Sequence, residues 1–334
     1  MTILITGGGG YIGSHVTLEA LKSDLKVIVL DDFSTSYIEN IERLNTFDSG
    51  SLEIISGDIC DENLVNKIFK NQSIKTVIHL AAKKSVEESN LLALDYYQTN
   101  IKGSLTLLDV MKKNNVNEFI FSSTAAVYGN SNDTPFKETA DVNPVNPYAR
   151  SKLMLEKIIQ DTANSQSGLK SVILRYFNPV GADESYLIGE SPKGETHNLF
   201  PKICKVLSGS QEYIEVYGDD YPTQDGSGVR DFIHITDLAL GHLTALTILN
   251  RSSQNFCSIL NLGNGQGYSV KEVIKMFERV TGKSIPYKIR GRRLGDVATS
   301  YADASLAKKE MNWSSRKDLE AMCRDSWNWH LKNN

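Results

Sequence analysis

The feature that most constrains this chain is a glycine-rich segment close to its start. Gly7 to Gly10 and Gly13 stand between the apolar run 3–5 and the helix-like pattern 16–21. A strand, a glycine turn and a helix start are the parts of a dinucleotide-binding crossover, in which N–H groups at the helix N-terminus hold a pyrophosphate. The residues predicted to contact a cofactor here are Gly7, Gly10, Tyr11, Ile12 and Gly13.

An acidic residue follows the next predicted strand. Residues 26–30 form a second strand pattern, which ends at Asp31. A carboxylate at this place accepts hydrogen bonds from both ribose hydroxyls and repels a 2′-phosphate, so it favours NAD over NADP. Because a glycine pattern alone is common by chance, the prediction depends on the strand, the helix and Asp31 together.

The order of apolar runs and helical patterns predicts the fold class. Up to residue 178 the two alternate, which is typical of a Rossmann-type, doubly wound parallel sheet in an α/β protein. Beyond that point the pattern loosens into short elements and long loops, which indicates a smaller α/β lobe for the substrate. We therefore expect a cofactor domain at 1–178, completed by segments near 230–262, and a lobe at 179–334.

Composition argues against several kinds of partner. With a net charge of −4, the chain has no general attraction for nucleic acid or for an anionic membrane. Its four cysteines are far apart, lack the spacing of metal ligands and are typical of a reducing compartment. No apolar run is as long as a membrane span, and a first strand at residue 3 leaves no room for a signal peptide. We expect a cytoplasmic protein without a metal.

A phenol and an ammonium stand four residues apart where a helix is predicted. Tyr148 and Lys152 would share one face of a helical turn, and Thr124 would end a strand at the carboxyl edge of the sheet. A tyrosine and a lysine at this spacing often lie on a solvated helix face. Their combination with the glycine segment and Asp31 is much harder to reach by accident, so we expect a catalytic group of three.

Together these residues resemble those of the extended short-chain dehydrogenase/reductase family, and within it the UDP-hexose 4-epimerases. The resemblance covers nearly the whole chain. It is carried by Gly7, Gly10, Gly13, Tyr148, Lys152 and the segments 77–79, 121–129, 175–182 and 219–234. It implies reversible epimerisation of UDP-hexoses at C4, through a transient 4-keto sugar, with tightly bound NAD.

The resemblance makes Tyr148 the base for the sugar's 4-hydroxyl, with Thr124 hydrogen-bonded to O4. An ordinary tyrosine has a pKa of about 10, which is too high for a base at neutral pH. One positive charge about 6 Å away, at an effective dielectric of roughly 20, contributes ~2.8 kcal/mol, or about two pH units. Lys152 and the nicotinamidium together are therefore expected to bring the pKa of Tyr148 to about 6 to 7.

Further contacts with both ligands are implied by the resemblance. Those with NAD, besides Asp31, Tyr148 and Lys152, are Asp32, Ser36, Asp58, Ile59, Ala81, Ala82, Lys84, Asn100, Ser122 and Tyr176. Those with the UDP-sugar, besides Thr124, are Asn178, Asn198, Leu199, Tyr217, Arg230, Arg293, Asp296 and Ser300. Thr35, Ala82 and Glu87 depart from common family patterns, which leaves the details of the cofactor contacts open.

Ser300 is implied to line the pocket beside C2 of the sugar. A tyrosine at this position fills the space that an acetamido group needs, and overpacking a formed site costs ~1–3 kcal/mol. A serine leaves the space open, so we expect UDP-GlcNAc and UDP-GalNAc to be accepted besides UDP-Glc and UDP-Gal. The alternative is that Tyr301 fills the gap instead.

A homodimer is also implied, through two helices expected at 88–114 and 148–163. The second is rich in apolar side chains beyond those that its own sheet would need, namely Leu153, Leu155, Ile158 and Ile159. Ordinary packing inside one chain is the alternative explanation.

Three other functions remain open from the residues alone. Sugar-nucleotide 4,6-dehydratases carry an Asp-Glu pair where this chain has Ala125 and Ala126, which cannot transfer protons. UDP-glucuronate epimerases and decarboxylases belong to the same superfamily, and the decarboxylases lack the segment 222–234. A non-catalytic NAD-sensing protein would typically have lost Tyr148 and Lys152.

Overall fold

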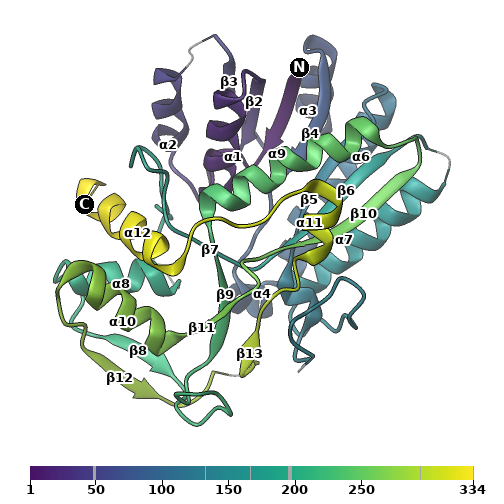
Figure 1. The fold of residues 1–334 in the computed structure, drawn as a ribbon. Helices are drawn as coiled ribbons and strands as arrows, with labels where there is room; N and C mark the ends of the chain where they lie inside the picture. Colours follow the sequence, from purple (N-terminus) through teal and green to yellow (C-terminus); the bar gives the residue numbers. More distant parts are fainter. Residues whose placement is uncertain (48–49, 132, 166, 195–197, 294, 334) are drawn as a thin grey trace.

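A seven-stranded parallel sheet forms the centre of the protein (Figure 1). The computed structural model describes residues 1–47, 50–131, 133–165, 167–194, 198–293 and 295–333. The strands lie in the order β3, β2, β1, β4, β5, β6 and β10. Their bounds are β1 (Thr2–Thr6), β2 (Lys26–Asp31), β3 (Leu52–Ser56), β4 (Ile74–His79), β5 (Glu118–Thr124), β6 (Lys170–Tyr176) and β10 (Phe256–Leu262). The predicted Rossmann-type α/β class is confirmed.

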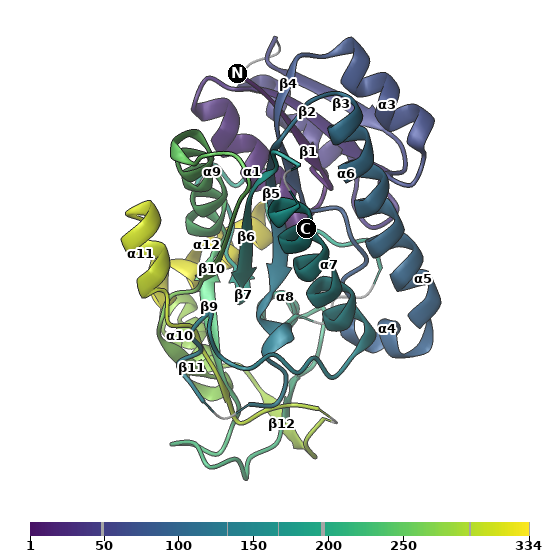
Figure 2. The same cartoon turned by 90° about the vertical axis from the view of Figure 1, so that its right-hand side faces the viewer.

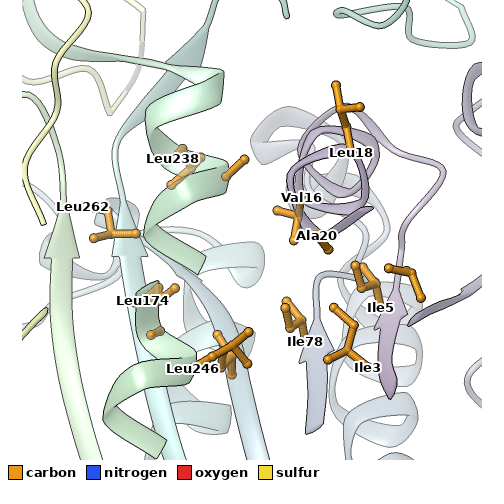
Figure 3. Packing of buried hydrophobic residues seen from close by; sticks show 14 of the residues in the cluster. Ile3, Ile5, Val16, Leu18, Ala20, Ile78, Leu174, Leu238, Leu246 and Leu262 are labelled. Carbon is orange, nitrogen blue, oxygen red and sulfur yellow. The ribbon is translucent and has the colours of Figure 1, made fainter. Parts of the chain in front are cut away.

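Side chains of the strands alternate between two hydrophobic cores, one on each face of the sheet. Ile3 and Ile5 of β1 belong to the first core, and Leu4 belongs to the second. The helices on the first face are α1 (Tyr11–Lys22), α9 (Ile235–Arg251) and α11 (Ser305–Met311). Those on the second face are α3 (Glu62–Asn71), α6 (Gly103–Lys113) and α7 (Pro147–Asn164). Figure 3 shows Val16 and Leu238, from α1 and α9, packed over the first face.

The sheet is completed by a segment from the second half of the chain. β10 pairs in parallel with β6 along its whole length, from Phe256 opposite Lys170 to Leu262 opposite Tyr176. α9, which precedes it, packs against α1. The chain therefore leaves the sheet after β6 and returns to it with α9 and β10, in the region where the sequence pattern predicts a completing segment.

The second lobe begins where β6 ends. β7 (Asn178–Val180) follows β6 after Phe177 and pairs in parallel with β9 (Val229–His234). The other elements of the lobe are α8 (Leu199–Leu207), β8 (Ile214–Tyr217), β11 (Gly267–Ser269), α10 (Val270–Thr281), β12 (Tyr287–Arg290), β13 (Thr299–Ser300) and α12 (Leu319–Asn333). In Figure 1 they lie below the large sheet, so the lobe faces the carboxyl ends of the parallel strands.

The single helix expected at 88–114 is wrong. The segment forms α4 (Val86–Leu91), α5 (Ala93–Tyr97), a π-helical turn η2 (Gln98–Lys102) and α6, which run beside α7 in Figure 2. Leu92 separates α4 from α5 with φ −121° and ψ 46°, which is not helical. The remaining short elements are α2 (Ile38–Glu42), η1 (Arg43–Thr46) and η3 (Ala125–Tyr128). Among the described residues, no helix combines the length and apolar character needed to cross a bilayer.

Candidate active site

Two glycines of the segment, Gly7 and Gly13, are packed so tightly that a side chain has no room. Gly7 has φ +72°, and a Cβ on it would lie 2.5 Å from the backbone nitrogen of Ala81. A Cβ on Gly13 would lie 2.1 Å from the carbonyl oxygen of Gly7. These glycines therefore let the loop, the start of α1 and the end of β4 touch through their backbones, as a dinucleotide site requires. Ala82 follows Ala81 at the same edge of the sheet.

The N-terminus of α1 is open to an anion. Its N-cap, Gly10, provides no side-chain cap, and its first turn carries no acidic residue. Tyr11 turns its hydroxyl away from the loop and donates to the carbonyl oxygen of Gly181, at 2.7 Å. The N–H groups at the start of α1, where Ile12 and Gly13 lie, and the positive end of its dipole are therefore suited to a pyrophosphate.

Asp31 lies beside this loop at the end of β2. Its carboxylate accepts hydrogen bonds from the N–H groups of Gly9, at 2.9 Å, and Phe33, at 2.8 Å. Burial raises the pKa of Asp31, and these two donors oppose that effect. Asp32 instead accepts from the backbone and hydroxyl of Ser34, at 2.9 and 2.6 Å, so the two neighbouring carboxylates point to different partners.

The other residues expected at the adenine and pyrophosphate follow the carboxyl ends of neighbouring strands. Ser36 is buried beyond β2, and Asp58 follows β3 and accepts from the N–H of Cys60 at 2.8 Å. Ile59 is buried against the second core, whereas Lys84, beyond β4, is exposed. The glycine cradle, the uncapped helix and Asp31 together fit NAD. Among the described residues, no cluster of histidine, cysteine or acidic side chains could hold a metal ion.

Helix α7 brings the expected catalytic side chains to the end of β5. The helix begins at Pro147, and the side chain of its N-cap, Asn146, accepts from the N–H of Ala149 at 2.9 Å. One turn later the Nζ atom of Lys152 donates to the carbonyl oxygen of Ser122, at 2.8 Å. Lys152 is buried, with its ammonium 4.9 Å from the centre of the Phe121 ring.

Burial changes the acid–base properties of this cluster. It raises the pKa of Tyr148, and a hydrogen bond with the side chain of Thr124 opposes the rise. It also lowers the pKa of Lys152 to about 7, which Glu156 opposes. The expected pKa of about 6 to 7 counted the charges of Lys152 and the nicotinamidium together and left out desolvation, which is the largest influence on Tyr148 among the chain's own groups. Tyr176 lies close by, with its ring 5.8 Å from His242.

A buried histidine, to which the sequence analysis assigned no role, connects the cofactor edge to α7. The two ring nitrogens of His79 lie 2.6 Å from the hydroxyl of Thr6 and 2.7 Å from that of Ser104. Burial, with a smaller contribution from Lys152, lowers the pKa of His79 to about 3, so the ring is neutral. Ser104 in turn donates to the carbonyl oxygen of Asn100, at 2.6 Å. No local sequence signal marks this role, because the partners are far apart in the chain.

Asn100 continues this network to the catalytic helix. Its side chain accepts from the N–H of Lys83 at 2.9 Å and donates to the hydroxyl of Ser151 at 3.0 Å. Ser151 donates to the carbonyl oxygen of Tyr148 at 2.7 Å. Asn100 is thus a buried structural link between the end of β4 and the backbone of Tyr148. Its contact with the cofactor, which the resemblance implies, stays a prediction.

Two arginines of the lobe are held in different ways. Arg230, on β9, donates through Nη1 to the carbonyl oxygens of Val229 and Val297, at 2.9 and 2.8 Å, and its Nη2 lies 3.4 Å from Asp296. The guanidinium of Arg293 lies over the ring of Tyr217, 3.9 Å from its centre. The four residues expected at the UDP group therefore form two pairs, Arg230 with Asp296 and Arg293 with Tyr217.

The remaining substrate residues lie at the starts of lobe elements or beside Arg230. Asn178 is the exposed first residue of β7, and Ser300 stands opposite Arg230 in the parallel pairing of β13 with β9. Asn198 is the N-cap of α8, which begins at Leu199, and its side chain donates to Glu190. This contact was not predictable from the sequence, since nothing in the local pattern marks Glu190.

Comparison with known proteins assigns the chain to a family. A family model described as GDP-mannose 4,6 dehydratase matches residues 4–326. The UDP-glucose 4-epimerase of Pasteurella multocida is 46% identical over 334 residues, which cover 100% of this chain and 98% of that protein.

Two solved structures of UDP-glucose 4-epimerases are similar over the whole chain. That from Stenotrophomonas maltophila, with bound NAD and formylated UDP-arabinopyranose, is 44% identical with a TM-score of 0.96, and the match covers 99% of this chain and 98% of that one. That from Bifidobacterium longum, in complex with NAD+ and UDP, is 43% identical with a TM-score of 0.94, covering 100% and 99%. The chain belongs to the UDP-glucose 4-epimerase family of the extended short-chain dehydrogenases/reductases.

Proposed function

We propose that this protein is an NAD-dependent isomerase that interconverts UDP-glucose and UDP-galactose by epimerisation at C4. The observation that carries the proposal is the cluster of Thr124, Tyr148 and Lys152 at the carboxyl end of β5. It lies in a Rossmann-type sheet whose glycine loop and Asp31 fit NAD. The similarity to UDP-glucose 4-epimerases over the whole chain supports the same activity.

The proposed chemistry at C4 divides the work among three side chains. NAD, when bound, supplies the hydride acceptor and a positive charge. Tyr148 takes the proton from the 4-hydroxyl and later returns it, while Thr124 hydrogen-bonds both the phenol and the sugar's O4. Because burial alone raises the pKa of Tyr148, its phenol becomes a base only next to positive charge. Lys152 provides the chain's own share of that charge at the base of the site.

The UDP group is proposed to bind between the lobe and the loops of the sheet. Arg230 and Arg293 suit a diphosphate, and Asp296 suits ribose hydroxyls. The 3.4 Å separation of Arg230 from Asp296 makes this ion pair a weak competitor for the ligand. Tyr217 would lie by the uracil. Asn178, Asn198 and Leu199 are proposed to complete the contacts with phosphates and sugar.

We further propose that the N-acetylated pair, UDP-GlcNAc and UDP-GalNAc, is accepted. The argument is the small side chain of Ser300 beside Arg230. The alternative occupant of the gap, Tyr301, packs near Gly267, because a Cβ on that glycine would lie 3.5 Å from the Tyr301 ring. Ser300 stands opposite Arg230, and Gly267 stands opposite the next residue of β9, Asp231. Successive side chains of a strand point to opposite faces, so the position of Tyr301 near Gly267 supports an open space at Ser300.

A second candidate, sugar-nucleotide 4,6-dehydration, is suggested by the description of the matching family model. Elimination of water from C5 and C6 needs an acid and a base next to the strand-end threonine. Here Ala125 and Ala126 follow Thr124 and open the short helix η3. Since neither alanine can transfer a proton, epimerisation is the better supported reaction.

A homodimer through the α4–α7 side is also proposed, although the four apolar residues of α7 expected to form it are buried or partly buried inside the chain. Leu155 and Ile159 are buried in the chain's own second core, and Ile158 packs against it. Leu153 packs against a smaller cluster around Tyr128. Other apolar side chains are exposed on this side, namely Leu91 (84%), Leu94 (67%), Leu105 (44%) and Met154 (46%). Such a surface is typical of an interface.

We also propose how the chain divides into domains and where in the cell it works. Residues 1–178, with α9 and β10, would form the cofactor domain, and the rest of 179–334 the substrate lobe. A cytoplasmic location agrees with four free cysteines and a ligand pair of metabolic nucleotides.

The experiment that tests the function is incubation of the purified protein with UDP-Glc, UDP-Gal, UDP-GlcNAc or UDP-GalNAc, without added NAD. We expect each sugar to yield its C4 epimer, because the hydride is returned in every cycle. Tyr148→Phe removes the base but keeps the ring, and should lower the rate by ~10²–10⁴. A 4-keto-6-deoxy product would support the dehydratase, and full activity of Tyr148→Phe would refute the assigned role of the phenol.

A further inference from the structure

Three consecutive residues of β5 each contact a different residue of α7. The carbonyl oxygen of Ser122 accepts from Lys152 at 2.8 Å, and Thr124 hydrogen-bonds Tyr148. Between them, the hydroxyl of Ser123 donates to the carboxylate of Glu156. Glu156 lies one helical turn beyond Lys152, as Lys152 lies one turn beyond Tyr148.

Arg175 ties the same carboxylate to the next strand. It stands on β6, directly opposite Ser123 in the parallel pairing. Its Nε and Nη2 atoms donate to the two carboxylate oxygens of Glu156, at 3.0 and 2.6 Å, which is a bidentate ion pair. Its Nη1 donates to the hydroxyl of Tyr128 at 3.2 Å. Glu156 is 0% exposed and Arg175 is 4% exposed, so the pair is fully inside the protein.

Among the groups around Lys152, Glu156 is the one whose charge stabilises the ammonium form. His79 faces it from β4 and is neutral, while Tyr148 of α7 and Tyr176 of β6 have raised pKa values and are neutral phenols. His242 of α9 is likewise kept neutral, because burial lowers its pKa to about 4. Within the described part of the chain, the carboxylate of Glu156 is the charge that favours the ammonium form of Lys152. Arg175, the other buried cation, is neutralised by the same carboxylate.

We propose that Glu156 is a positioning residue for the tyrosine–lysine pair. Glu156 docks α7 on β5 and β6 and favours the ammonium form of Lys152 beside Tyr148. The proposal rests on the proposed function, since it concerns the protonation state that Lys152 needs for catalysis. Glu156 does not touch the substrate region; it acts through Lys152.

The test is the pH dependence of kcat/KM of the NAD-loaded enzyme for Glu156→Gln. The amide keeps the size of the side chain and a hydrogen bond with Ser123, but it removes the negative charge and leaves Arg175 uncompensated. Both changes favour the neutral amine of Lys152. The alkaline limb, where the ammonium is lost, should therefore move to lower pH by about one to two units, while Glu156→Asp should leave it near its wild-type position.

Two further variants separate this role from a structural one. Tyr128→Phe removes a hydroxyl from the same network without changing its charge, so it should lower stability and leave the alkaline limb in place. Glu156→Gln combined with Arg175→Met replaces the whole ion pair and avoids an unpaired buried charge. It should fold and still show a smaller shift in the same direction, which keeps the test valid if the single variant fails to fold.

The outcomes distinguish this proposal from the proposed function. If Tyr148→Phe is inactive while Glu156→Gln and the double variant keep the wild-type alkaline limb, the role of Glu156 is refuted and the epimerase assignment stands. If Tyr148→Phe is fully active, the function itself is refuted. A downward shift in both glutamate variants, with none in Tyr128→Phe, supports the proposal.

Discussion

Replacing two glycines of the cofactor loop by alanine should have opposite effects on folding. A Cβ on Gly13 would lie 2.1 Å from the Gly7 oxygen and 2.6 Å from the Gly8 Cα, whereas carbon atoms in contact usually lie about 3.5–4 Å apart. Gly7 cannot retreat freely, because its N–H donates to Leu30 at 2.8 Å and its Cα faces Ala81. Since backbone meets backbone on both sides, Gly13→Ala should cost about 3 kcal/mol, the upper end for overpacking.

Gly10→Ala is the matched control at the same loop. Its Cβ would meet nothing closer than the Gly7 oxygen at 3.4 Å, and its φ of −72° and ψ of 174° suit any residue. This variant should therefore fold as stably as the wild type, or about 0.4–1 kcal/mol better. It should nevertheless lose NAD, because the added methyl group stands where the helix N-terminus meets the pyrophosphate.

Both variants are compared by urea unfolding and by the nucleotide released on denaturation. Unfolding is measured with and without added NAD, since a bound ligand stabilises the folded state by itself. We expect Gly13→Ala to lose both stability and NAD, and Gly10→Ala to lose NAD alone. Wild-type stability of Gly13→Ala would refute the reasoning about close packing, and full NAD content of Gly10→Ala would refute the location of the pyrophosphate.

Three further predictions concern other parts of the molecule. Ser300→Tyr should reduce turnover of UDP-GlcNAc about 10- to 100-fold and leave turnover of UDP-Glc unchanged, as measured by product chromatography, and Ser300→Ala is the control. Equal losses for both sugars would contradict the location of Ser300 beside C2 of the sugar. With NAD removed, Lys152→Met should be about 3.5 kcal/mol more stable to urea at pH 6. Burial holds the lysine pKa at about 7 against an unfolded value of about 10.4, which corresponds to about 4.6 kcal/mol, and the lost hydrogen bond of Lys152 offsets about 1 kcal/mol of this gain. That cost of folding is complete below pH 7 and vanishes as pH rises toward about 10, so a pH-independent difference would disprove it. Leu94→Asp should convert the dimer into a monomer, as measured by light scattering. Leu331 is also exposed but lies on α12, so Leu331→Asp should leave the dimer intact. A monomeric wild type would refute the proposed homodimer.

Local patterns were sufficient to predict the parallel sheet and α7. The helix expected at 148–163 spans Pro147–Asn164, because an N-cap asparagine, a proline at the first turn and regular apolar spacing all agree. The break at Leu92 was not predictable, since no glycine or proline marks it. Across the break, the hydroxyl of Tyr96 donates to the carboxylate of Glu88 at 2.7 Å.

The catalytic residues of the site were predictable from the sequence, but the pKa values of their side chains were not. Tyr148, Lys152 and Thr124 could be identified by spacing and by resemblance, and they do come together. The raised pKa of Tyr148 could not be predicted, because residues distant in sequence bury its side chain. For the same reason the link from His79 through Asn100 to α7 emerges only in three dimensions.

The return of the chain to the sheet has a consequence for how the protein is made. β6 acquires its outer neighbour, β10, only after the whole of β7 to α9 has been synthesised. Until then a nascent chain that has completed β6 presents an unpaired apolar strand edge, the kind of surface that recruits other strands. We therefore expect the cofactor half to be unable to mature on the ribosome as an independent unit. A fragment that stops after β6 should therefore aggregate more readily than the full chain.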